Sequence, residues 1–95
     1  MTAYLIAQTE IHDSETYDRY KAQVLPLIQK FGGRFIVRGG QLEVLEGDWT
    51  PSRLVVIEFP SMAHIRDWFA SPEYAPLLAM RQQAAVDCLV AVEGC

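Results

Sequence analysis

Apolar positions fall into two kinds of run along the 95-residue chain. Residues 3–9 and 88–93 carry apolar residues at both odd and even positions, which is typical of strands covered on both faces. Residues 53–59 (RLVVIEF) form the strongest such run, and Pro60 ends it. Between these runs apolar residues recur at helical spacing, from Asp13 to Phe31 and again from Ser61 to Ala84.

Capping residues indicate where the two helical stretches begin and end. Asp13 and Ser61 are the expected N-caps, because their side chains accept hydrogen bonds from the first turn. Gly32 and Gly33 follow the first helix, and one of them is expected in the left-handed conformation. Pro26 predicts a kink or a second short piece in that helix. The Ser71-Pro72-Glu73 segment predicts that the second helix is broken and restarts there.

Residues 34–46 allow two interpretations. Gly39-Gly40 is either a two-residue hairpin turn or a glycine bulge inside one long bent strand. A hairpin there makes residues 53–59 run in the same direction as the first strand. We therefore favour the bulge, with the reversal at residues 47–52 (GDWTPS).

The element order is β-α-β-β-α-β in a single domain over residues 1–95. This order predicts an α+β, ferredoxin-like sandwich. Its four-stranded antiparallel sheet has the first and third strands at the centre and the helices on one face.

The first, third and fourth strands are apolar on both faces, but two helices cover only one face of a four-stranded sheet. The other face is a larger apolar patch than a monomer usually exposes. The simplest cover is a second copy, packed sheet against sheet about a two-fold axis. We therefore expect a homodimeric α/β barrel with a small interior.

Charge and composition narrow the possible partners. The net charge of −4 argues against nucleic acid and against an acidic membrane surface. Cys88 and Cys95 have no metal-binding spacing and are too few for a disulfide scaffold. The first residues lack the basic segment of a signal peptide, and no apolar stretch approaches the length of a membrane span. We expect a cytoplasmic protein without metal or cofactor.

Glu58 is the first candidate for chemistry. It lies in the most apolar run, between Ile57 and Phe59, where lost hydration favours a raised pKa or a charged partner. Glu58 is therefore either a general acid/base in a cavity or half of an ion pair with Arg38 or Arg81.

The remaining candidates are cations and tyrosines. Arg38, beside two glycines, is either a clamp for a substrate carboxylate or an edge-strand charge that pairs with Glu58. Arg81 is a ligand clamp or a salt-bridge partner near a helix end. Tyr17, Tyr20 and Tyr74 either place hydroxyls at a cavity mouth or belong to the core.

Two further residues have structural interpretations. Arg53 faces Glu43 or Glu46 if the hairpin closes at residues 47–52, which favours cross-strand charge pairing. Trp49, in the turn itself, is the expected anchor of this loop on its own chain or on a partner.

Several segments together resemble one known family. They are FGGRFIVRGG (31–40), LEGDWTPSRLVVIEFPS (45–61), SPEY (71–74), VEG (92–94) and the opening Asp13, Glu15 and Tyr17 followed by Tyr20. The combination is similar to the small bacterial family known as domain of unknown function 1330. Phe35 departs from the pattern, because relatives often carry Tyr there.

The resemblance implies the dimeric α/β-barrel superfamily, which includes cofactor-free monooxygenases, haem-degrading enzymes and small isomerases. Fold alone does not fix function. The first hypothesis is a cofactor-free enzyme that holds a small organic molecule in an apolar cavity, with Glu58 as acid/base and Arg38 as anion clamp. The alternatives are a ligand-binding module without catalysis, or a dimer with a filled interior that binds another protein.

Overall fold

The computed structural model describes residues 1–95 and contains four strands and three helices. In chain order they are β1 (Ala3–Ile11), α1 (Ser14–Lys30), β2 (Arg34–Arg38), β3 (Leu54–Phe59), α2 (Met62–Phe69), α3 (Ala75–Ala84) and β4 (Ala85–Glu93). The predicted order is confirmed, with the second helix in two pieces.

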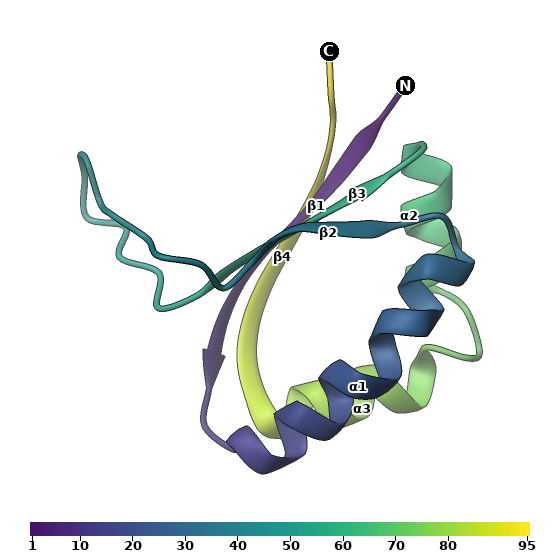
Figure 1. Cartoon of the computed structure of the whole chain (residues 1–95), viewed down its shortest axis with the longest axis horizontal. Coiled ribbons are helices and arrows are strands. Elements are labelled where there is room, and N and C mark those ends of the chain that lie inside the picture. Colours follow the sequence, from purple (N-terminus) through teal and green to yellow (C-terminus); the bar gives the residue numbers. More distant parts are fainter.

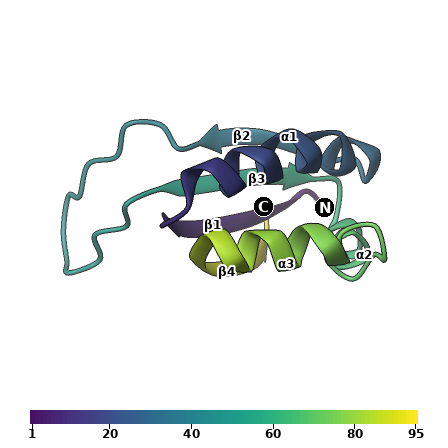
Figure 2. The same cartoon turned by 90° about the horizontal axis from the view of Figure 1, so that it is seen from below.

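The strands form one sheet in the order β2-β3-β1-β4, and every neighbouring pair is antiparallel. The predicted ferredoxin-like arrangement, with the first and third strands central, is therefore confirmed. All three helices lie on one side of the sheet (Figures 1 and 2). None of them is both long and apolar enough to cross a membrane.

The core lies between the helices and the sheet face that they cover. Alternate residues of a strand point to opposite faces, so Leu5 on β1 and Val55 and Ile57 on β3 share the helix side. Burying each such side chain stabilises the fold by roughly 1.5–3 kcal/mol. The largest fully buried apolar side chains are Trp68, Tyr74, Phe59 and Ile28.

The helix ends follow the capping residues, except that the last helix starts later than predicted. Asp13 accepts a hydrogen bond from the Thr16 backbone N–H at 3.2 Å, and Gly32 adopts a φ of 85° after α1. The helix α1 continues through Pro26 as one element. Ser71 stabilises a turn, accepting from the Tyr74 N–H at 3.2 Å, and α3 begins only at Ala75.

The long second strand is shorter than predicted. β2 ends at Arg38, and its register shift lies between Phe35 and Val37 instead of at Gly39-Gly40. The chain bends back at residues 46–48, so the hairpin-turn alternative for the glycine pair is also wrong. Residues 41–51, which we call the arm, project away from the sheet on the side opposite the helices and pair with no strand, as Figure 1 shows. These residues therefore lie outside the core between the helices and the sheet.

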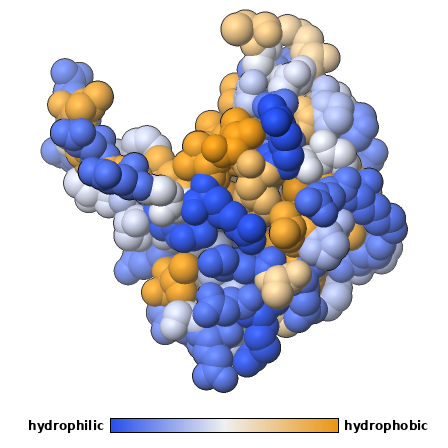
Figure 3. All heavy atoms as spheres, viewed as in Figure 1, coloured by the Kyte–Doolittle hydropathy of each residue, from blue (hydrophilic) through white to orange (hydrophobic).

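The sheet face away from the helices is open and largely apolar. Val86, Val90 and Val92 of β4 are 64%, 60% and 48% exposed, and Ile6 and Val56 lie on the same side. Figure 3 shows apolar atoms at the base of the notch between the arm and the strands. The predicted uncovered apolar face is therefore present in the single chain.

Candidate functional site

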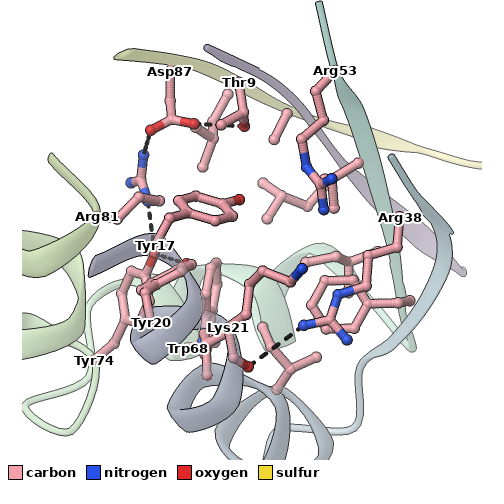
Figure 4. A pocket seen from close by; sticks show the side chains of 18 residues that line it. Thr9, Tyr17, Tyr20, Lys21, Arg38, Arg53, Trp68, Tyr74, Arg81 and Asp87 are labelled. Carbon is pink, nitrogen blue, oxygen red and sulfur yellow. Dashed lines mark hydrogen bonds and ion pairs between the residues drawn. The ribbon is translucent and has the colours of Figure 1, made fainter. Parts of the chain in front are cut away.

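A cavity lies between the helices and the sheet, enclosed by side chains from every helix and strand. Its volume, measured as the space open to the centre of a water molecule, is about 40 Å³. One water needs roughly 10–15 Å³ on this measure, so the cavity as it stands holds only a few. Five residues predicted from the sequence line it: Tyr17, Tyr20, Arg38, Tyr74 and Arg81. Figure 4 shows these side chains converging on the cavity. They come from α1, from β2, from α3 and from the turn that precedes α3.

Glu58 does not belong to this group. It alternates with Ile57 and Phe59, which face the helices, so its side chain lies on the open face. There it pairs with Arg34, at 3.2 Å between Arg34 Nη2 and Glu58 Oε2. The expectation that its partner is Arg38 or Arg81 is wrong, because both arginines are on the other side of the sheet.

One end of the cavity carries a buried polar network. The Tyr20 and Tyr74 hydroxyls lie 2.9 Å apart, and Arg81 Nε donates to the Tyr74 hydroxyl at 3.2 Å. Arg81 Nη1 donates to Asp87 Oδ2 at 2.7 Å, and the Thr9 hydroxyl donates to Asp87 Oδ1 at 2.6 Å. Of the two interpretations of Arg81, the salt-bridge partner is therefore the one that the structure describes.

Burial changes the ionisation of this network. Loss of hydration, together with the neighbouring Tyr74, raises the pKa of Tyr20 far above its usual value of 10.0. For Arg81, burial opposes the charge, but Tyr74 and Asp87 outweigh it and raise the pKa. At neutral pH the Tyr20 phenol is therefore neutral, and Arg81 and Asp87 form one buried ion pair beside it.

Tyr20 makes a testable contribution to stability at alkaline pH. Its folded-state pKa is raised, so its stabilisation is complete below about pH 10 and is lost as the pH rises further. Above pH 10 the wild type is expected to lose up to about 1.4 kcal/mol per pH unit through this residue. Urea unfolding of wild type and Tyr20→Phe between pH 8 and 11 measures the loss. If the free energy of unfolding falls with pH at the same rate in both proteins, Tyr20 makes no such contribution.

The other end of the cavity is cationic. Lys21, Arg38 and Arg53 all line it, and none has a carboxylate oxygen within 4.0 Å. Arg38 Cζ lies 4.2 Å from the centre of the Phe35 ring, and Arg38 Nη2 donates to the Lys21 carbonyl at 3.5 Å. Arg53 Cζ lies 5.8 Å from the centre of the Tyr17 ring. Figure 4 shows the three cations grouped on one side.

Two buried donors on the cavity wall have no partner. They are Arg53 Nε and Trp68 Nε1. A buried donor without a partner costs roughly 1–3 kcal/mol, so each is a position where a ligand acceptor is favoured. No three His, Cys, Asp or Glu side chains lie together so as to hold a metal ion.

Sequence reasoning missed the residues that complete this site, although a signal for some of them was present. Arg53 lies two residues before Val55, and alternate residues of a strand point to the same face. Arg53 therefore faces the helices, as Val55 and Ile57 do, and not Glu43 or Glu46. Lys21 lies one helical turn after Tyr17 on α1. Asp87 carried no local signal, since it meets Thr9 and Arg81 only through the fold.

The sequence and the fold are both similar to known proteins. A family model described as domain of unknown function (DUF1330) matches residues 2–95. No curated protein matches the sequence.

Two of the solved structures that are similar in fold to the whole chain are RPA0582 and SnoaB. RPA0582, a protein of unknown function from Rhodopseudomonas palustris, has a TM-score of 0.79 and 20% identity over 99% of this chain and 82% of its own. SnoaB, a cofactor-independent oxygenase from Streptomyces nogalater, has a TM-score of 0.73 and 12% identity over 99% of this chain and 93% of its own. At these identities the similarity is one of fold.

Proposed function

We propose that this chain, which belongs to the family described as domain of unknown function DUF1330, binds a small organic anion in the cavity. The acidic group of the ligand lies against Lys21, Arg38 and Arg53. Its organic part lies along the aromatic and aliphatic wall. The same site serves either simple binding or catalysis on the bound anion.

The observation that supports the proposal most strongly is the unpaired cationic group. The protein carries a net charge of −4, so cations are scarce in it, yet three of its eight Lys and Arg residues line one cavity without an acidic partner. Partly buried charges are unfavourable unless they are paired. A bound carboxylate or phenolate supplies the missing charge through short, charge-assisted hydrogen bonds.

The other walls favour a small planar ligand. Phe35, Tyr17 and Trp68 supply aromatic surface, and the Trp68 N–H is a free donor there. Because the cavity volume is only about 40 Å³, a ring-sized ligand requires side chains at the cationic end to move apart.

We also propose that the chain acts as a homodimer joined through its open sheet face. The strands of that face carry exposed apolar residues, and so does the arm, at Val44 and Leu45. Apolar atoms also lie at the base of the notch between the arm and the strands in Figure 3. Stable dimers bury about 800 Å² per partner, which a four-stranded face with a projecting arm can provide. Trp49 donates to Gln8 Oε1 at 2.6 Å and so ties the arm to the edge of this face.

A second candidate function is oxygenation without a cofactor. It is favoured by the fold similarity to SnoaB and by the cationic end, which stabilises the anionic form of a weakly acidic substrate. Such an anion reduces dioxygen itself: a CH₂ group becomes C=O, one oxygen atom enters the product and the other leaves as water. Consumption of one dioxygen per product is the expected signature.

Removing single cations tests the binding proposal. Lys21→Met and Arg38→Met are each expected to weaken the binding of benzoate about 10- to 100-fold, because each removes a hydrogen bond to a charged group. Isothermal titration measures the dissociation constant. Arg19→Met is the control, since Arg19 is an exposed cation paired with Glu15 outside the cavity. Equal weakening by all three variants would assign the effect to net charge alone.

A further inference from the structure

A shallow groove lies outside the cavity, where β1 ends and the arm begins. Its six lining residues are Thr9, Glu10, Ile11, Gly39, Ser52 and Arg53. Two of these, Thr9 and Arg53, also line the cavity, so they form the wall that separates the two spaces.

Only one of the two shared residues is free to move. Thr9 is 2% exposed, its hydroxyl donates to Asp87, and its backbone N–H donates to the Arg53 carbonyl at 3.0 Å. Arg53 has a long side chain, no ion pair and a buried Nε without a partner. A rotation of the Arg53 side chain therefore opens the wall without breaking a hydrogen bond.

Gly39 leaves the space in which the Arg53 guanidinium rests. A Cβ built on Gly39 lies 2.6 Å from Arg53 Cζ, which is closer than real side chains approach, and the φ of Gly39 is 73°. The positive φ favours glycine at this position, and a side chain there would displace the flexible end of Arg53. The next residue, Gly40, has no atom within 4 Å of a Cβ built on it and no positive φ.

We infer that the anion enters the cavity from this groove, and that Arg53, whose guanidinium packs against Gly39, closes the entrance and then binds the anion. This inference rests on the proposed binding function and adds the route and the moving residue. It explains why a cation without a partner lies at the wall and why the cavity is small in the absence of a ligand. The Arg-Gly-Gly segment then has a second role beside Arg38, since Gly39 positions Arg53.

Stopped-flow binding of benzoate tests the entrance. Trp49→Phe leaves Trp68 in the cavity wall as the one tryptophan, and its fluorescence reports binding. In that background, Arg53→Met is expected to speed entry several-fold and to weaken affinity about 10- to 100-fold, since the gate and one charged hydrogen bond are both lost. Gly39→Ala is expected to weaken affinity about 10-fold by displacing the guanidinium. Gly40→Ala is expected to leave the association and dissociation rates within about two-fold of the background.

The double variant Gly39→Ala/Arg53→Met separates positioning from general damage. If Gly39 acts through Arg53, the double variant binds benzoate as Arg53→Met does. A further loss of affinity in the double variant, or a Gly39→Ala protein that binds like Gly40→Ala, overturns the inference and leaves the proposed function intact. A background protein that binds no benzoate overturns the proposed function itself.

Discussion

Asp87→Asn is expected to destabilise the fold by about 3–5 kcal/mol, because it leaves the Arg81 charge buried without its partner. The side chains of Arg81 and Asp87 are only 8% and 3% exposed, and Asp87 also accepts from Thr9. For a domain of this size, 3 kcal/mol lowers the melting temperature by at least about 12 °C. Urea unfolding and thermal melting at pH 7 measure the effect.

Glu73→Gln is the matched control. It breaks the Lys30–Glu73 pair, whose side chains are 60% and 50% exposed. Exposed pairs contribute about 0–1 kcal/mol, so this variant is expected to melt close to the wild type. If Asp87→Asn costs no more than Glu73→Gln, the buried network does not stabilise the fold as argued.

Val90→Asp is expected to convert the proposed dimer to a monomer. Val90 lies on β4 opposite Ile6 of β1, in the open sheet face, and is 60% exposed in the single chain. A two-fold interface buries two such carboxylates in apolar surroundings, which weakens association by more than about 100-fold. Sedimentation equilibrium then gives the mass of one 10.7 kDa chain, while the wild type gives twice this value.

Ala63→Asp controls for the added charge. Ala63 is exposed in the first turn of α2, where an acidic residue is favourable, and lies on the helix side of the molecule. It is expected to remain dimeric. A wild-type protein that sediments as a single chain at tens of micromolar would rule out the homodimer proposal.

The apolar runs along the strands predicted the fold because they reflect which faces are covered. The consecutive apolar residues of β1 and β3 required two covered faces, and the glycines and proline at their ends fixed the element order. The arm was not predictable in the same way. Residues 41–44 alternate between polar and apolar like a strand, but no strand or helix layer lies beside the arm, so it stays unpaired.

The candidate site was predicted in part for the same reason. Arg38, Arg81 and the tyrosines were found by residue type, and they converge because their elements cover one sheet face. The hypothesis that Glu58 is an acid/base in the cavity rests on hydrophobicity alone. Glu58 alternates with Ile57 and Phe59, which places it on the other face. The Arg53 side chain points to the opposite face from Glu58 and lines the cavity. The Asp87 contact joins residues from β1, α3 and β4, which only the folded chain brings together.

Calorimetric titration of the wild-type chain with benzoate and with benzamide tests the central claim most directly. The two ligands share a ring and a similar size, but only benzoate carries the charge that Lys21, Arg38 and Arg53 lack in the free protein. Benzoate is expected to bind at least about 10-fold more tightly, with an affinity that falls as salt rises. Equal affinities for the two ligands, or no binding of either, would contradict an anion site in this cavity.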